Sequence, residues 1–538
     1  MKSGPSNASR ATPPRALVWA WPPLLAGLAL LANGYRYGTT DQAIHLTFLR
    51  ELIDPGGMAA DLVATRGGAH ASLWWHLQTP LVRWIGWENL PHLYLCLYVV
   101  ALVATFALLV QLARTLLGNP WAALVAPLLL VVFKGCPAHV HTFEPELINR
   151  TAVHPLLLGA VWLLLRGRPI RAAALCGLAF DLHATTASHV ALALAVAMLA
   201  DPALRSRSLR AAGAFLVCAA PLLAMVALRG GPEAWWIDEA WMNVLRWRMP
   251  HHLFPDRWPA AVWLVASFQL GLWVVASRWI ADRTTRRRAH LLVAGVLLCG
   301  PLLGTLAAGP LPLAPLLALH LWEAWILLAV LAYLAAGGAV FALLRGRRWW
   351  ATPAGVALGL ALVVGFESTA MGLREPVTFT VGARGGTAGE LVDALGGTRF
   401  RVSAGSSLLV PPTGMTWLRA EAGRAIFVSV KDGGEAIFDR ELAMDWRRRL
   451  DDLCGEDLLA GTPPASEWRG YRAVGERARA AFARQSAEDL RRLAARERAW
   501  LLVVPKSSGR SGLTPVYLND DYFVYDLRHP VSGAGANR

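Results

Sequence analysis

The stretch PHLYLCLYVVALVATFALLVQLA, residues 91–113, decides the class of this protein. It contains no Lys, Arg, Asp or Glu, and it is long enough to cross the hydrocarbon core of a bilayer as one helix. Apolar runs of similar character recur from residue 16 to residue 366, and a polar tail follows. The sequence therefore predicts an α-helical polytopic membrane protein with about 11 transmembrane helices. They are expected near 16–33, 91–113, 119–133, 152–166, 170–182, 185–200, 209–228, 259–277, 289–308, 319–343 and 350–366.

The composition of the chain agrees with a membrane location. Of the 538 residues, 55% are hydrophobic and only 17% are charged, whereas soluble domains have about 25% charged residues. The net charge of +15 could indicate a nucleic-acid partner, but the arginines lie in short loops between the apolar runs. The positive-inside rule explains that placement, so we expect no nucleic acid as a partner. The six cysteines show neither metal-like spacing nor a disulfide framework.

Short basic loops set the predicted orientation. Arginine-rich loops recur on the side of the N-terminal tail 1–15, and the positive-inside rule places that side in the cytoplasm. These loops are 166–171, 203–210, 277–288 and 345–348. The transmembrane domain is thus expected at 16–366 and an extracytoplasmic domain at 367–538. The main predicted external loops are 34–90, 134–151, 181–189 and 229–258.

The first apolar run admits two interpretations. Basic residues precede it, as they do in a secretory signal peptide, but the run is longer than most signal sequences. We favour an uncleaved first helix. Cleavage would leave Asp41, which follows the run, on the same external side.

The tail predicts a small α/β domain. Strand-like runs alternate with helical patterns, which favours a layered α/β arrangement. The predicted strands are 406–412, 424–430, 500–505 and 522–527, and the predicted helices are 387–396, 440–453 and 473–497. The tail has no phosphate-binding glycine loop and no nucleophile elbow. It is therefore interpreted as a lid, a scaffold or a partner-binding domain.

Polar residues that can do chemistry gather in the predicted external loops. TTDQAIHL, residues 39–46, places Asp41, Gln42 and His45 directly after the first span. Asp41 could simply cap the amphipathic helix predicted near 41–53, because Asp is a favoured N-cap residue. A second helix near 72–86 is rich in tryptophan and suits the membrane surface. Three further external segments carry the other candidates, which are Glu144, Arg150, Asp181, His183, Arg248, His251 and His252.

This layout resembles a known superfamily. A cytoplasmic N-terminus, an acidic residue soon after the first span and an external C-terminal domain resemble the GT-C membrane glycosyltransferases, which use polyprenyl-phosphate sugars. The strings TTDQAIHLTFLRELIDP, FEPELINRTAVHP and LRWRMPHHLFPDRW also resemble uncharacterised bacterial membrane proteins defined by the DUF6798 domain. The tail segment LLVPPTGMTWLRAEAGRAIFVSVKDG resembles the C-terminal part of that group. The resemblance implies a multi-pass protein of the bacterial inner membrane.

The GT-C resemblance implies roles for these residues. Asp41 would be the catalytic carboxylate, either as the base toward the acceptor hydroxyl or as a metal ligand, with His45 one turn away. The other seven candidates would bind the substrate or its phosphate. A divalent metal such as Mg²⁺ or Mn²⁺ could be held by Asp41, His251 and His252. The implied partners are a polyprenyl-phosphate-linked sugar, an extracytoplasmic acceptor (a glycan, lipid or protein) and membrane lipids.

Two other function classes stay open at this point. A transporter or flippase of an envelope precursor would need ionisable residues near the middle of the bilayer and paired repeats. Glu323 is the main residue of that kind, and no convincing repeat is present. A non-enzymatic scaffold for envelope assembly would account equally well for the tryptophan-rich helices and the tail.

Overall fold

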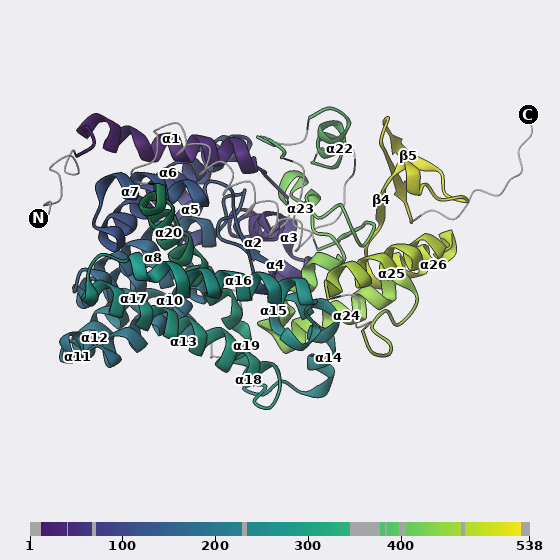
Figure 1. Cartoon of the computed structure of the whole chain (residues 1–538). Coiled ribbons are helices and arrows are strands. Elements are labelled where there is room, and N and C mark those ends of the chain that lie inside the picture. Colours follow the sequence, from purple (N-terminus) through teal and green to yellow (C-terminus); the bar gives the residue numbers. More distant parts are fainter. Residues whose placement is uncertain are drawn as a thin grey trace, which may run out of the picture.

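A computed structural model describes residues 12–39, 41–66, 72–228, 234–344, 377–381, 385–396, 400, 405–463 and 468–528. These residues are mainly helical, with a small sheet near the C-terminus. In Figure 1 the apolar helices fill the left part of the molecule and the tail fills the right part. Helices α2, α3 and α4 lie where the two parts meet.

Five helical segments among the described residues are long and apolar enough to cross a membrane. They are α1 (Arg15–Asn33), η3 and α6 (Trp87–Leu117), α16 and η7 (Ala260–Trp279), α17 to α18 (Arg283–Ala308) and the segment of η9 and α20 at Leu321–Ala342. A sixth span results if α12 (Ser208–Cys218) and α13 (Ala220–Leu228), bent by 61°, count as one. So many apolar helices make the chain a multi-pass membrane protein.

The remaining predicted spans are shorter helices or lie outside the described residues. The run at 119–133 folds as α7 (Pro120–Val125) and η4 (Ala126–Leu130). The next three runs form α8 (Asn149–Leu165), α9 (Pro169–Leu182) and α10 (Ala184–Ala200), followed by α11 (Pro202–Arg205). With 17 residues each, α8 and α10 are at the lower limit of length for crossing a bilayer, whereas α9, with 14, is below it. The predicted span at 350–366 lies outside the described residues, so the count of 11 stays a prediction.

The predicted external segments fold into short elements. The first loop forms α2 (Gln42–Ile53), α3 (Pro55–Met58), α4 (Leu62–Arg66) and α5 (Leu73–Ile85), which confirms the two helices expected there. The second forms a small hairpin of β1 (Gly135–Cys136) and β2 (Val140–His141) around η5 (Pro137–His139). The later loops form α14 (Glu239–Arg248), α15 (Pro250–Leu253), η6 (Pro255–Arg257) and α19 (Ala314–Ala318).

The tail is a small α/β structure, as predicted. Its sheet has the order β3-β4-β6-β5, with β3 parallel to β4 and the other pairs antiparallel. The strands are β3 (Leu408–Leu409), β4 (Leu501–Pro505), β5 (Pro515–Leu518) and β6 (Tyr522–Asp526). The helices are α22 (Thr387–Gly396), α23 (Leu418–Ala422), η10 (Val430–Ile437), α24 (Arg440–Cys454), α25 (Gly470–Arg484), α26 (Ala487–Glu497) and η11 (Lys506–Ser508).

Two predicted elements of the tail differ from the structure. The strand expected at 424–430 makes only one bridge, from Ile426 to Leu408, before η10 begins. A capping box between Ser429 and Asp432 starts that helix and ends the extended run. The single helix expected at 473–497 is two helices, because a second capping box at Ser486 starts α26.

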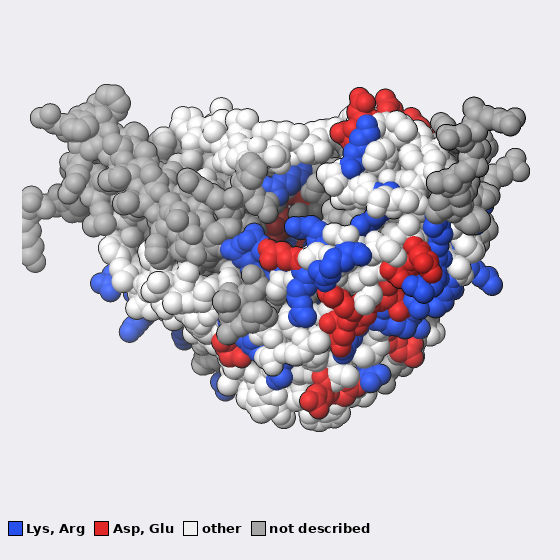
Figure 2. Space-filling model, turned by 90° about the vertical axis from the view of Figure 1, so that its right-hand side faces the viewer, with Lys and Arg blue, Asp and Glu red and all other residues white. Residues whose placement is uncertain are grey.

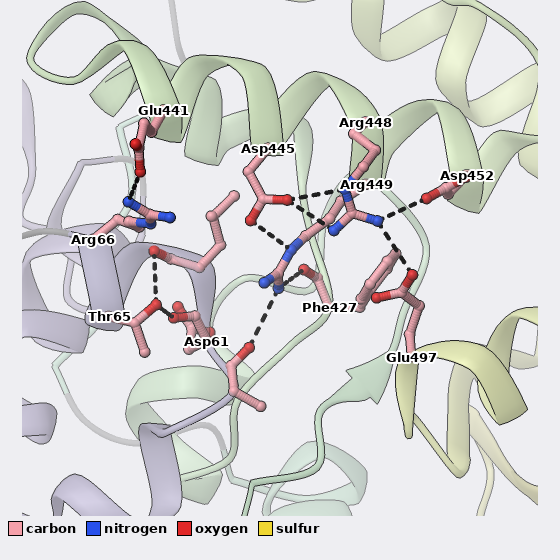
Figure 3. A network of polar contacts seen from close by, with 12 residues as sticks. Asp61, Thr65, Arg66, Phe427, Glu441, Asp445, Arg448, Arg449, Asp452 and Glu497 are labelled. Carbon is pink, nitrogen blue, oxygen red and sulfur yellow. Dashed lines mark hydrogen bonds and ion pairs between the residues drawn. The ribbon is translucent and has the colours of Figure 1, made fainter.

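The tail and the predicted external loops share one hydrophobic core. Trp241 and Trp247 of α14 are buried together with Phe427 and Trp446 of the tail. Polar contacts also connect the tail to the first loop. Arg449 of α24 donates a hydrogen bond from its Nη1 to the carbonyl of Ala60 at 3.3 Å (Figure 3). The tail is therefore packed against the external loops as part of one structure.

A buried ion triad fixes the tail against the first loop. The Arg419 guanidinium donates to Asp61 at 2.6 Å and to both carboxylate oxygens of Asp432 at 2.6 and 2.7 Å. All three side chains have 0% exposure. Asp61 precedes α4, whereas Asp432 lies in η10, so the triad sets the position of η10 on the first loop.

Candidate functional site

A cavity of about 840 Å³ lies where the predicted external loops meet the tail. Eight of the nine predicted site residues line it: Asp41, His45, Glu144, Arg150, His183, Arg248, His251 and His252. Asp181 does not line it; its carboxylate accepts a hydrogen bond from the backbone N–H of Leu222 at 3.1 Å instead. Charged side chains gather on the tail's face of the molecule, which Figure 2 shows beside a hollow.

Asp41 stands at the N-cap position of α2, but its carboxylate makes no capping hydrogen bond. The carboxylate instead forms an ion pair with Lys431. The ammonium of Lys431 is the main reason that the pKa of Asp41 lies well below its usual range, with smaller effects of Arg150 and His45 in the same direction. Its side chain is 45% exposed. Asp41 is therefore an ionised group facing the cavity.

Lys431 is the functional candidate that sequence reasoning missed. It comes from η10 of the tail, 390 residues beyond Asp41. The triad of Arg419 holds the neighbouring residue Asp432 and so positions Lys431. Nothing in its local sequence separates it from a surface lysine, because only the packing of the tail on the first loop brings it to Asp41.

A second cluster surrounds Arg150. Its guanidinium donates to Glu144 at 2.9 Å and to Glu323 at 3.1 Å. Glu323 also lies 3.2 Å from Nδ1 of His320 and 3.6 Å from Nδ1 of His252. Glu323 thus faces the cavity that Asp41 lines and belongs to the same site.

Arg248 connects the cavity wall to the tail. Its Nε donates to the carbonyl of Val430 at 2.9 Å and its Nη2 to that of Lys431 at 3.3 Å. Burial lowers the pKa of Arg248 to about 10. Arg248 therefore stays charged at neutral pH while it holds the backbone on both sides of the Lys431 peptide.

Gln42 joins two walls of the cavity. Its Oε1 accepts from the backbone N–H of Gly38 at 2.6 Å, and its Nε2 donates to the carbonyl of Leu147 at 2.8 Å. Its side chain is fully buried. Gln42 therefore holds the segment that carries Asp41 against the segment that carries Glu144 and Arg150.

Four imidazoles form a row along one side of the cavity. The ring centroids of His139 and His251 are 5.6 Å apart, those of His251 and His252 are 4.1 Å apart, and those of His252 and His320 are 5.4 Å apart. Within the described chain, one nitrogen of each ring is buried and makes no hydrogen bond to protein. The row is flanked by aromatic side chains of the tail, among them Tyr471, whose ring lies 5.1 Å from that of His251.

Because burial lowers the pKa of histidines in this row, we predict that the free energy of unfolding of the protein falls as the pH is lowered. Burial lowers the pKa of His139 to about 3 and that of His252 to about 4, whereas an unfolded histidine has a pKa of about 6.5. Between these values the unfolded chain binds more protons, so stability is lost as the pH falls from about 6.5 toward 4. The apparent melting temperature should drop over this range. His139→Asn, which tolerates the positive φ, and His252→Gln should each flatten the drop; an unchanged slope would contradict the prediction.

The residues proposed for a divalent metal do not converge. In the described ranges, no three His, Cys, Asp or Glu side chains come together as a metal site. Asp41 is already paired with Lys431, a cation that would repel a metal ion. The metal therefore stays a prediction without structural support, and no step below is assigned to it.

An apolar groove opens beside the cavity. It has a volume of about 410 Å³ and is lined by Leu28, Leu31, Ala32, Leu128, Val131 and Val132. Ala32 and Val132 line both the groove and the cavity. A single ligand with a charged head and an apolar chain could therefore occupy both at once.

Comparisons with known proteins give only distant matches. No family model and no curated protein matches the chain, so the resemblance to the DUF6798 group is not confirmed. Two solved structures are similar to it at a low level. The archaeal oligosaccharyltransferase AglB from Archaeoglobus fulgidus, in complex with an inhibitory peptide and a dolichol-phosphate, aligns with a TM-score of 0.42 and 9% identity over 91% of this chain and 69% of its own. ArnT from Cupriavidus metallidurans, bound to undecaprenyl phosphate, aligns with a TM-score of 0.40 and 13% identity over 97% of this chain and 99% of its own. Scores below 0.5 do not establish a common fold, so the function is inferred from the cavity itself.

Proposed function

We propose that this protein is an integral membrane glycosyltransferase that moves a sugar from a polyprenyl-phosphate donor to an extracytoplasmic acceptor. One observation carries the proposal: a cavity that holds an ionised carboxylate among cations continues into an apolar groove. The cavity suits the phosphate and sugar of a lipid-linked donor, and the groove suits its chain. In the proposed orientation the N-terminus is cytoplasmic, and the cavity and tail lie outside the cytoplasm.

The donor phosphate would be bound by the cations that surround Asp41. Arg150 and Lys431 both lower the pKa of the Asp41 carboxylate, so both cations lie close enough to Asp41 to interact with a charge there. Guanidinium groups suit phosphate because their planar N–H groups bind two oxygens at once. Arg248 has its Nε and Nη2 engaged with the tail and would contribute its charge.

Asp41 would accept the proton of the acceptor. The acceptor oxygen attacks the anomeric carbon, the bond from that carbon to the phosphate oxygen breaks, and the phosphate leaves with the electron pair. The hydroxyl proton passes to the Asp41 carboxylate. Paired with Lys431, Asp41 is a weak base. A donor phosphate that draws Lys431 to itself would raise the pKa of Asp41 and make it a better base at the moment of transfer.

Transfer in a defined membrane tests this proposal. Full-length protein in nanodiscs is mixed with radiolabelled polyprenyl-phosphate sugars and an extract of envelope acceptors, and labelled product is measured. A glycosyltransferase forms a new glycoside and releases the polyprenyl phosphate. A flippase would instead move the lipid across a proteoliposome membrane without any product, and a scaffold would do neither. Either of the last two results would contradict the proposal.

The groove makes a separate prediction about the lipid chain. Ala32→Trp should fill the passage between groove and cavity and weaken binding of undecaprenyl phosphate about tenfold, because each buried methylene contributes about 0.8 kcal/mol. Binding of inorganic phosphate, measured by isothermal titration, should not change. Leu24→Trp is the matched control, since Leu24 lies on the same helix, is 50% exposed and does not line the groove. Equal effects of the two substitutions would argue against a lipid in the groove.

A further inference from the structure

The imidazole row is the part of the cavity that the proposed transfer step does not use. Donor binding and proton transfer engage Asp41, Lys431 and Arg150. The row runs from His139 to His320 along the wall formed by the hairpin, α15 and the segment before η9. It therefore offers a second set of polar groups in the same cavity.

The row has the character of a binding surface, because all four rings line the cavity and part of their hydrogen-bonding capacity is unused within the described residues. Buried polar atoms in folded proteins nearly always have a partner. Here Nδ1 of His139, Nδ1 of His251 and Nε2 of His320 are buried and make no hydrogen bond within the described residues. His251 as a whole is 4% exposed. These nitrogens are enclosed by protein, so a ligand in the cavity would meet the remaining edges of the rings.

Backbone strain marks both ends of the row. His139 has a φ of 55° and His320 a φ of 47°, in the left-handed region that non-glycine residues rarely adopt. Of the four such residues in the described ranges, only Arg498 lies far from the row, since Ala138 adjoins His139. Backbone strain of this kind is concentrated at functional sites, where the surrounding structure holds it in place.

The row favours a ligand that carries many hydroxyl groups. Two imidazolium charges could not coexist at the 4.1 Å separation of the His251 and His252 rings. A neutral imidazole has one donor and one acceptor nitrogen, and a sugar hydroxyl can serve either. Aromatic rings flank both ends: Trp468 lies 5.1 Å from His139 and Phe438 lies 6.2 Å from His320, between ring centroids. The faces of such rings suit the C–H faces of a sugar ring, and the Arg469 guanidinium also lies 5.1 Å from the Trp468 ring centroid.

We propose that the imidazole row is the acceptor site and that the acceptor is a carbohydrate. This inference rests on the proposed glycosyl transfer for its biological meaning, but the binding site itself does not. The row would hold the sugar so that one hydroxyl points toward Asp41, and the tail residues Trp468, Tyr471 and Phe438 would close over it. The tail thereby contributes to acceptor recognition as well as to the position of Lys431.

Binding of free saccharides tests the inference without catalysis. Full-length protein in nanodiscs is screened by saturation-transfer NMR against uncharged trisaccharides and against matched trisaccharides that contain a uronic acid. We expect binding of at least one of these trisaccharides. His251→Phe keeps the ring and removes the nitrogens, and it should weaken saccharide binding about tenfold or more. His251→Gln, which restores a donor and an acceptor, should recover part of the loss.

Two controls separate this site from the donor site and from misfolding. His290→Phe makes the same change at a histidine that packs on Trp273 and does not line the cavity, so saccharide binding should be unchanged. Undecaprenyl phosphate should bind all variants with equal affinity. The inference is overturned if no saccharide binds, or if His251→Phe binds saccharide as well as the wild type does. Saccharide binding without any transfer activity would instead contradict the proposed function and still support the saccharide-binding site.

Discussion

Asp41→Asn is expected to lower the rate of sugar transfer by about 10²–10⁴-fold, the usual contribution of a positioned general base. Asparagine keeps the size of the side chain and the backbone of α2. It removes the charge that Lys431 pairs with and the group that would accept the proton. The loss should appear mainly in kcat, because the phosphate of the donor would still meet Arg150 and Arg248.

The control for Asp41→Asn is Asp256→Asn. Asp256 also stands near the cavity in sequence and space, beside the loop of His251 and His252, but its side chain is 75% exposed and does not line the cavity. Its substitution should leave transfer at the wild-type rate. The assay is labelled-product formation in nanodiscs after both variants are shown to insert normally. Wild-type turnover by Asp41→Asn would remove this carboxylate from the mechanism and return it to a structural role.

Arg419→Met is expected to destabilise the packing of the tail by about 3–5 kcal/mol, the cost of removing one partner from a buried ion cluster. Methionine fills much of the space but leaves Asp61 and Asp432 buried without their cation. Because Asp432 adjoins Lys431, the same change should also disturb the partner of Asp41. We expect a lower apparent melting temperature, faster proteolysis of the tail and slower transfer.

The control for Arg419→Met is Arg448→Met on α24. Arg448 contacts the carboxylates of Asp445, Asp452 and Glu497, and Figure 3 shows it at the centre of that network. Its side chain is nevertheless 49% exposed, and exposed ion pairs contribute at most about 1 kcal/mol. We thus predict that Arg448→Met lowers the stability of the protein less than Arg419→Met does, although Arg448 makes more ion pairs. A larger loss of stability in Arg448→Met would show that desolvation is not the deciding factor.

The membrane architecture was predictable because it depends on local patterns. A long apolar run such as 91–113 must form a helix in lipid, where every backbone polar group needs an internal partner. The same reasoning overestimated the shorter runs: a stretch such as 170–182 is apolar enough for lipid but equally suited to burial between neighbouring helices. Length and composition cannot separate these two environments.

The candidate site was predictable only in part. Loops on one side of a membrane are confined to a thin layer. Polar residues in these loops avoid the hydrocarbon and therefore tend to face one another or water. For this reason eight of the nine candidates line one cavity. Asp181 differs because a carboxylate at a helix end also serves as a hydrogen-bond acceptor for a neighbouring helix. Sequence alone could not separate these two uses.

The sequence by itself determined a multi-pass membrane protein with a small α/β tail and a carboxylate just after its first span. These features follow from hydrophobic length, strand and helix patterns and the order of residues along the chain. Only the tertiary structure decided that Asp41 pairs with Lys431, that Glu323 faces the same cavity, and that four imidazoles form a row. The pairs Asp41–Lys431, Arg150–Glu323 and His139–His251 each join residues far apart in the chain. The first pair meets because a buried core and a buried ion triad hold the tail against the predicted external loops.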